Sequence, residues 1–377
     1  MNETTKRSVF RRGWPGTLCW GMTACLGGLW IAAGATAWAQ RPSTDRHVPE
    51  LGRYLDRVQI AEPVVFRGLA VYPVLLSSGP DLRGAWLTMD QAISRGVLVV
   101  SEKGGGGSVP VVIVENRSHS EHVFMMGGEV ISGGKQTRTV RNDLILAPGQ
   151  RIDLDVFCVE AHRWSGEKSF GSAKLLVPQS IQHELRRGTS QAGVWAEVAR
   201  NNAALKAENA TGSLETAINS RPVQDGLAEV RGGIVPKIPE GTVGFIFVHG
   251  QRALGAEFFG NEEMARSLLP KLLDSYAVDY VLLKREEAGL RPVPRPDNRV
   301  AIEFYERVCR AGSDRTGTPG SGAGIRTRTA GLLGDGASLS SSLVHYGVQT
   351  EVRIIPMPGP RPGPRPLGGI RQRSSRE

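Results

Sequence analysis

The sequence predicts an α+β fold: an antiparallel, strand-rich N-terminal half with hairpins, followed by helices and a strand–helix unit, in one compact domain. One observation is a series of β-branched and apolar runs between residues 64 and 160, separated by glycine and proline turns. Another is the helical spacing of apolar residues between 178 and 208. Strands and helices therefore occur in blocks, which favours α+β over an alternating parallel sheet.

The first elements are short strands and one capped helix. The apolar run Val64–Leu76 predicts one or two opening strands. Thr88 followed by Gln91 is typical of a capping box and predicts a helix that ends near Arg95. A strand over Val97–Ser101 comes next, and the four consecutive glycines after it form a linker. Because a further strand follows these glycines, and not a helix, we favour a linker over a phosphate-binding loop.

The middle of the chain is expected to consist of four strands joined by tight turns. They cover Val109–Glu115, His122–Ser132, Lys135–Leu146 and Arg151–Glu160. Gly133 and Gly134 are predicted to form a two-residue hairpin turn, since both can adopt positive φ. This turn pairs Ile131 with Gln136 and Glu129 with Arg138.

The remaining elements are mainly helical. The spacing of apolar and capping residues predicts helices over Pro178–Arg187 and Gln191–Glu208, then a loop or fraying helix over 209–221 and a strand over Thr242–His249. A helix capped by Asn261 follows, which Pro270 is expected to kink or restart, and a closing hairpin is predicted within 331–356. The predicted globular domain thus spans 62–310 together with that hairpin. Residues 40–61 are expected to form an N-terminal linker, and the Gly/Ser-rich residues 311–330 an insertion or linker.

Both ends of the chain differ from this body. Residues 1–39 have basic residues up to Arg12, then an apolar stretch, then the A-x-A pattern of Ala37 to Ala39, which predicts a signal peptide cleaved after Ala39. We therefore expect a periplasmic or secreted protein. The alternative is an uncleaved membrane anchor. Residues 357–377 alternate Pro, Gly and Arg and are expected to form a disordered tail, either a solvated end or a contact to an anionic envelope surface.

The charge is concentrated at these ends. The chain has a formal net charge of +9, of which +3 lies in residues 1–39 and +5 in residues 311–377, leaving +1 for residues 40–310. Basic residues are not clustered with aromatic residues in the body. This pattern argues against specific nucleic-acid binding by the folded part.

The hairpin around Gly133 and Gly134 supplies the first candidate site. In the expected pairing, Glu129, Ile131, Gln136 and Arg138 share one face. Arginine offers a planar set of donors and Glu129 an acceptor, a combination suited to phosphate or sugar groups. The alternative is a cross-strand ion pair on a solvated face.

The second candidate site follows the strand over Arg151–Glu160. Alternation places Cys158 and Glu160 on an apolar face, where the carboxylate needs a partner such as His162 or Arg163. Glu160 is a candidate general base or ligand acceptor. A buried thiol beside a structural Glu160–Arg163 pair, with Trp164 packed over it, is the alternative. Cys158 and Cys309 are the cysteines left after cleavage, and they either pair or remain buried thiols.

No metal site and no cofactor are predicted. His119 and His122 lie in a polar turn without further ligands at the spacing of a zinc site. Walker and dinucleotide-binding fingerprints do not occur in the sequence.

Two segments resemble a known family. The run from Glu129 to Arg138 (EVISGGKQTR) and the run from Cys158 to Trp164 (CVEAHRW) are similar to the paired signature of the ARG and Rhodanese-Phosphatase-superfamily-associated protein domain, a family in which ARG stands for ADP-ribosylglycohydrolase. The resemblance implies association with ADP-ribose or related nucleotide metabolism. It also marks six positions as a ligand pocket: Glu129, Gln136, Arg138, Glu160, Arg163 and Trp164, with Glu129 and Glu160 as the catalytic candidates.

Two hypotheses about function remain open at the level of sequence. The first is a domain that binds or processes a small phosphorylated ligand, such as an ADP-ribose-related nucleotide. The second is a non-enzymatic envelope module that binds a protein or a cell-wall polymer, with the basic tail as a tether.

Overall fold

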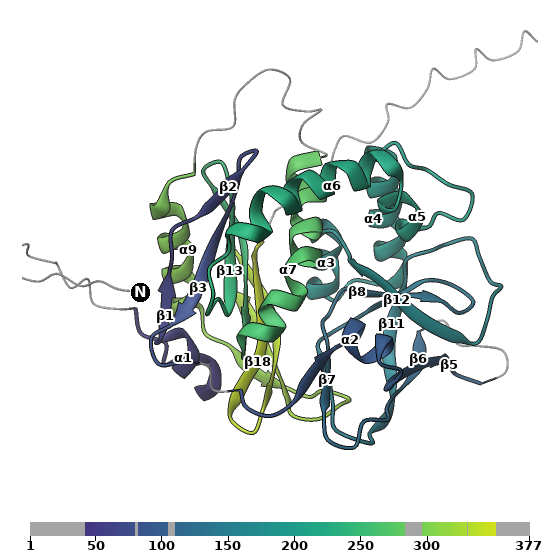
Figure 1. The fold of residues 1–377 in the computed structure, drawn as a ribbon, viewed down its shortest axis with the longest axis horizontal. Coiled ribbons are helices and arrows are strands. Elements are labelled where there is room, and N and C mark those ends of the chain that lie inside the picture. The colour runs from purple at the N-terminus through teal and green to yellow at the C-terminus, as the bar shows by residue number, and fades with distance from the viewer. Residues whose placement is uncertain (1–41, 80–81, 105–109, 283–295, 330, 352–377) are drawn as a thin grey trace, which may run out of the picture. The chain divides into compact units, whose positions relative to one another are not determined.

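A nine-stranded antiparallel sheet is the largest element of the fold (Figure 1). The computed structural model describes residues 42–79, 82–104, 110–282, 296–329 and 331–351. The sheet has the order β1-β3-β13-β14-β18-β17-β16-β15, with β2 also paired to β3. Its strands are β1 (Val58–Ile60), β2 (Val64–Phe66), β3 (Leu69–Leu76), β13 (Gly244–His249), β14 (Arg252–Phe259), β15 (Asp314–Thr316), β16 (Ala323–Thr329), β17 (Leu332–Leu339) and β18 (Ser342–Thr350).

Helices cover both faces of β3 and β13. Figure 1 shows α6 (Arg221–Ile234) and α7 (Glu262–Ala277) on one side of these strands, with α1 (Pro49–Leu55) and α9 (Asn298–Ala311) on the other. Alternate residues of each strand enter the two separate cores: Phe245 and Phe247 pack with α6 and α7, whereas Ile246 and Val248 pack with α1 and α9. Burial on both faces explains why these strands are continuous apolar runs.

The part of the chain between β3 and α3 (Gln179–Arg187) contains a closed barrel. Its strands have the order β11-β6-β5-β12-β8-β9. A small sheet, β10-β7-β4, lies beside it, with β4 and β7 parallel. The bounds are β4 (Trp86–Thr88), β5 (Leu98–Glu102), β6 (Val111–Asn116), β7 (His122–Met125), β8 (Glu129–Gly133), β9 (Arg138–Val140), β10 (Leu144–Leu146), β11 (Arg151–Cys158) and β12 (Ser169–Leu176).

The remaining helices follow the barrel or lie next to its first strands. They are α2 (Met89–Ser94), α3 (Gln179–Arg187), α4 (Gln191–Ala204), α5 (Leu214–Ile218), the 3-10 turn η1 (Val235–Lys237) and the π turn η2 (Val278–Leu282). The strand-rich antiparallel half followed by helices confirms the predicted α+β class. Helix α5 lies inside the region expected to be a loop or a fraying helix, and Ser213 caps it by accepting from the backbone N–H of Thr216.

Two helix starts follow the predicted capping chemistry. Gln91 Oε1 accepts from the backbone N–H of Thr88 at 2.9 Å, which begins α2. Asn261 Oδ1 accepts from the backbone N–H of Met264 at 2.8 Å, which begins α7. Pro270 does not end or restart α7, which continues through it to Ala277. The buried apolar side chains on both sides of Pro270 hold this helix together.

Two expected linkers contain regular structure. The region 40–61 includes α1 and β1, because Leu51, Tyr54 and Leu55 are buried in the core under the large sheet. The Gly/Ser-rich region 311–330 includes β15 and β16, which pair with each other and extend the sheet through β17. Backbone hydrogen bonds between these strands stabilise regular structure there, although the segment is rich in Gly and Ser. The predicted signal peptide (1–39) and the tail (357–377) lie outside the described residues.

The central hairpin has a different register from the one expected. Gly133 and Gly134 both have positive φ, but Ile131 pairs with Arg138 and Val130 with Thr139, a slip of two residues. Residues 134–137 are therefore a longer loop. Two of its N–H groups bind carboxylates: Glu102 accepts from the N–H of Lys135 and Glu160 from the N–H of Thr137.

Candidate functional site

Five of the six expected site residues lie at one end of the barrel. Arg138 begins β9 and Gln136 lies in the loop before it. Glu160, Arg163 and Trp164 follow β11, whose last residue Cys158 pairs with Arg138. The paired strands β9 and β11 thus bring the two signature segments together.

Arg138 is a fully buried arginine with spare donors. Its Nη1 donates to the backbone oxygen of Gln136 at 2.9 Å and to Gln136 Oε1 at 3.3 Å. Its Nη2 lies 3.8 Å from Glu102 Oε1, which balances the charge. Within the described part of the chain, Nε and Nη2 of Arg138 and Oε2 of Glu102 have no hydrogen-bond partner. Unsatisfied buried donors of this kind are costly, which makes them candidates for a functional role.

Trp164 covers this arginine and is half exposed. Its side chain is 46% exposed, an unusual value for a large aromatic residue. The Cζ of Arg138 lies 5.7 Å from the centre of the ring, and Nζ of Lys135 lies 5.4 Å from it. Both cations thus stack on the indole. The indole thus lies between these two cations and solvent.

Glu160 and Arg163 hold the glycine loop in place. Arg163 donates to Glu160 from Nε and Nη2, at 2.9 and 2.7 Å. The same guanidinium donates to the backbone oxygens of Gly133 and Gly134. Burial raises the pKa of Glu160, but hydrogen bonds from Arg163 and from the N–H of Thr137 outweigh it, so the pKa is lowered overall. Glu160 is therefore an ionised positioning group whose bonds stay within the protein.

Glu129 does not join this cluster. Its carboxylate is bonded to Lys271 of α7 and accepts from the N–H of Met126 at 2.8 Å. Lys271 also lies 2.8 Å from Asp90 of α2. Because of the two-residue slip, Arg138 opposes Ile131, and the expected set of Glu129, Gln136 and Arg138 is split between two places. Burial raises the pKa of the Glu129 carboxyl.

The sequence interpretation missed Glu102. This residue ends β5, whose burial alternates with Leu98, Val100 and Glu102 as the buried positions. A carboxylate at an inward position of an alternating strand was the available signal. Lys271 offered a similar signal, since it lies among the apolar residues of the buried face of α7.

A second polar cluster links the barrel to the large sheet. His345 of β18 contacts Asp143, in the segment before β10, through Nδ1 at 2.6 Å, and Glu257 of β14 through Nε2 at 3.0 Å. Nη2 of Arg186 on α3 lies 3.3 Å from Glu257 Oε1. Burial lowers the pKa of His345, but the two carboxylates outweigh it and raise the pKa to about 9.

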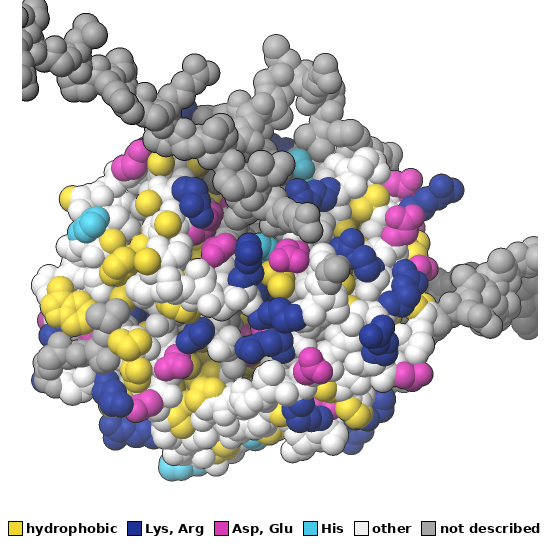
Figure 2. All heavy atoms as spheres, turned by 180° about the vertical axis from the view of Figure 1, so that it is seen from behind, with side chains coloured by type: hydrophobic (Ala, Val, Ile, Leu, Met, Phe, Trp, Pro, Cys, Tyr) yellow, Lys and Arg dark blue, Asp and Glu magenta, His cyan; other side chains and the backbone are white. Residues whose placement is uncertain are grey.

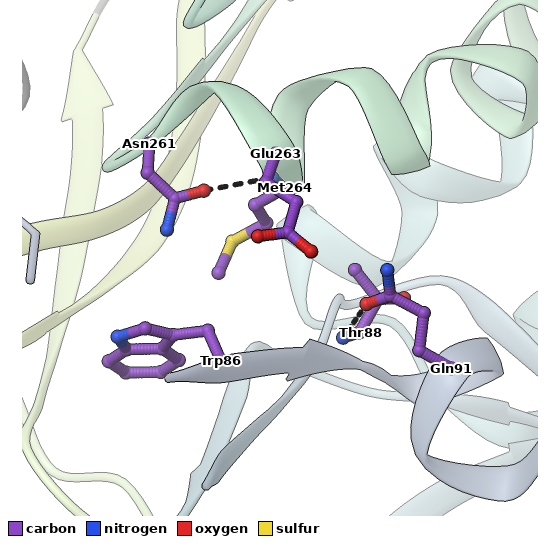
Figure 3. A pocket seen from close by; sticks show the side chains of 6 residues that line it. All are labelled: Trp86, Thr88, Gln91, Asn261, Glu263 and Met264. Carbon is purple, nitrogen blue, oxygen red and sulfur yellow. Dashed lines mark hydrogen bonds between the residues drawn. The ribbon is translucent and has the colours of Figure 1, made fainter. Parts of the chain in front are cut away.

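Small, partly open recesses lie in the described part of the protein, one of them at the His345 cluster. One, of about 280 Å³, is lined by Asp143, Arg141, Gln182, Arg186, Asp335 and His345 among others. Another, of about 180 Å³, lies between β4 and the start of α7 (Figure 3). There Gln91 and Asn261 are both engaged in helix capping, and Figure 3 shows Trp86 beneath Met264. That second recess is therefore lined by structural groups.

The two cysteines in the described residues are buried and form no disulfide bond. Cys158 lies on β11 and Cys309 on α9. Burial raises the pKa of each to about 11, which keeps them protonated near neutral pH. In the described ranges, no group of three or more His, Cys, Asp or Glu side chains is arranged to hold a metal ion. The same ranges contain no helix that is long and apolar enough to cross a bilayer.

The fold and the site together define an α+β protein in which a closed barrel presents a buried arginine beneath an exposed tryptophan. A family model described as the ARG and Rhodanese-Phosphatase-superfamily-associated Protein domain matches residues 57–348. Because this match covers most of the chain, the protein belongs to that family, which confirms the resemblance of its two signature segments. Comparisons with curated proteins and with solved structures found no match. The family's name indicates association with ARG and rhodanese-phosphatase superfamily proteins.

Proposed function

We propose that the Arg138–Trp164 end of the barrel binds a small phosphorylated ligand, of which an ADP-ribose-related nucleotide is the best candidate. The observation that carries this proposal is the pair of unpartnered nitrogens, Nε and Nη2, on a buried guanidinium. Two adjacent N–H donors in one plane match two oxygens of a phosphate group.

Trp164 supports the choice of a ligand with a ring. An exposed indole that already stacks on two cations offers a flat apolar surface to a base. Rotation of this side chain away from Arg138 opens the path to the guanidinium. Lys135, which stacks on the same ring, adds a second positive charge for a diphosphate.

The same proposal assigns positions to the other site residues. Gln136 orients Arg138 through two hydrogen bonds to Nη1, and Glu160 with Arg163 fixes the loop that carries Gln136. We assign Glu129 no role at this site, because its carboxylate is bonded to Lys271. The proposal is thus ligand binding, without a reaction assigned to either carboxylate.

Export is part of the proposal. The basic and apolar segment over residues 1–39 supports cleavage after Ala39 and a periplasmic or secreted setting. The basic residues near the C-terminus support contact between the tail and an anionic envelope surface. In this setting the alternative function is an envelope module that binds a protein or a cell-wall polymer.

The test is isothermal titration of the full chain with ADP-ribose, ADP and ribose 5-phosphate. We expect at least one nucleotide to bind, and Arg138→Gln and Trp164→Leu each to weaken binding at least tenfold, about 1.4 kcal/mol. Arg151→Gln, an exposed arginine on β11, is the matched control and leaves affinity unchanged. Trp164→Leu remains informative if Arg138→Gln does not fold, because Trp164 is half exposed.

Two results contradict this proposal. Absence of binding by all three ligands to the folded wild-type chain would favour the envelope module. Nucleotide binding that survives in both Arg138→Gln and Trp164→Leu would place the ligand elsewhere on the molecule.

A further inference from the structure

The recess between the barrel and helix α3 differs from the barrel site in its residues and in its balance of donors and acceptors. It is lined by Arg141 and Asp143 from the segment after β9, by Gln182 and Arg186 from α3, and by Asp335 and His345 from the large sheet. Segments far apart in the chain thus place three basic and two acidic side chains around a recess that is open to solvent.

The carboxylates around this recess already have partners within the protein. Asp143 accepts from the N–H of Gly127 through Oδ1 and contacts His345 through Oδ2. Asp335 is bonded to Arg326 and Arg328. Glu257, behind His345, contacts both that imidazole and Arg186. The acceptors of the cluster are therefore occupied.

The donors are not all occupied. Arg186 is only 7% exposed, and its Nη1 has no hydrogen-bond partner in the described ranges. Arg141 lies over the ring of Phe157, with Cζ 5.3 Å from its centre, and its guanidinium has no ion pair with a described carboxylate. A ligand for this recess must therefore supply acceptors, not donors.

The backbone leaves room for this arrangement at one glycine. A Cβ at Gly347 of β18 would collide with Glu257 Oε2 and with Arg186 Nη2. The absence of a side chain at 347 lets the guanidinium and the carboxylate lie directly against the strand. Buried charges that need such space are expensive to maintain, which favours a role beyond packing.

We propose that this recess binds a small oxyanion, the phosphate or carboxylate group of a small molecule, between Arg141 and Arg186. Nη1 of Arg186 supplies buried N–H donors, and the guanidinium of Arg141 supplies donors that are less buried. His345 contributes a further positive charge. The oxyanion suits the recess because it offers acceptors to the unpartnered Nη1 of Arg186 and to the Arg141 guanidinium. This inference does not depend on the proposed function of the barrel site.

The experiment is a titration of the full chain with inorganic phosphate, followed by ³¹P line broadening, and a parallel calorimetric titration with acetate. We expect the wild-type chain to bind at least one of the two anions. The anion that binds identifies the source chemistry, phosphate or carboxylate. Arg141→Gln and Arg186→Gln should each weaken binding at least tenfold. Arg187→Gln is the matched control, since Arg187 is the exposed neighbour of Arg186 on α3.

Three results would overturn the proposal. One is that neither anion binds the folded wild-type chain. Another is that Arg187→Gln weakens binding as much as Arg141→Gln, which would indicate general electrostatic attraction. The third is that Arg138→Gln abolishes anion binding while Arg141→Gln does not, which would assign the anion to the barrel site. Arg141 is not fully buried, so its variant keeps the test decisive even if Arg186→Gln fails to fold.

Discussion

At the scale of single residues, buried charges in this protein depend on neighbours that provide space or partners. Arg138 and Glu102 face each other at one end of the barrel, and Arg186 and Glu257 lie against β18. In the first case the loop backbone supplies further partners, and in the second a glycine supplies room. Loss of either feature leaves a charge buried without compensation.

Gly347→Ala tests this dependence at one position. The added methyl group collides with Glu257 and Arg186, so we expect a loss of about 3 kcal/mol in the free energy of unfolding. Urea denaturation measures it. The control is Gly232→Ala on helix α6, where a Cβ meets no atom within 4 Å. That change should be neutral or stabilise by up to about 1 kcal/mol. Equal effects of the two substitutions would refute the steric explanation.

At the scale of elements, the loop over residues 134–137 is held by side chains from other strands and loops. Arg163 bonds two carbonyl groups of the turn, while Glu102 and Glu160 bond two of its N–H groups. These contacts add to backbone bonds such as that from the N–H of Gly134 to Ser169 O, and together they position Gln136 against Arg138.

Arg163→Ala removes the cation from this arrangement. We expect a loss of about 2 kcal/mol in stability, because Glu160 loses its partner and two carbonyl groups lose a donor. Hydrogen exchange of residues 133–137 should accelerate more than that of the rest of the barrel. Lys168→Ala, at an exposed position in the same connection, should leave both measurements unchanged. Unaltered exchange of the loop in Arg163→Ala would show that the loop is held by other contacts.

At the scale of the whole molecule, buried polar groups join the barrel to the large sheet. Lys271 reaches from α7 to Glu129 of β8, and His345 reaches from β18 to Asp143. The contact between the barrel and the large sheet is thus ionic as well as apolar, and its stability depends on pH.

On the face drawn in Figure 2, basic and acidic side chains are interspersed, so that face has no continuous basic patch.

His345 gives the sign of the dependence on pH. Its pKa in the folded protein is raised to about 9, above the value near 6.5 expected for an unfolded chain. The resulting stabilisation, roughly 3 kcal/mol, is fully present below pH 6.5 and is lost as the pH rises to 9. Chemical unfolding of the wild-type chain between pH 6 and 9 should show this loss, and His345→Gln should be less stable at pH 6 and should not show the same loss.

The comparison of His345→Gln with the wild-type chain has a control and is restricted to pH 6–9. His119→Gln, an exposed histidine, should retain the wild-type pH profile. Above pH 9 the raised pKa values of Cys158 and Cys309 cause a further loss of stability, because their thiols ionise more readily in the unfolded chain. If His345→Gln and the wild-type chain have the same slope between pH 6 and 9, His345 is not the coupling group.

Local chemistry made part of the fold predictable. The helix starts at Thr88 and Asn261 were correct because a cap is decided within three residues of the chain. The turn at Gly133 was only half correct. Positive φ was predicted, but the register depended on Glu102, Glu160 and Arg163, which lie far away in sequence or in another segment.

The candidate site shows the same division. The sequence brought attention to Arg138 and Trp164 through the signature segments, and it determined the α+β class, the family and the position of the net charge. It did not show Glu102 beside Arg138, nor His345 beside Asp143, which is 202 residues away. Only the tertiary structure decided which polar side chains meet. The reason is physical: the partner of a buried charge is chosen by packing of distant elements, which no local pattern encodes.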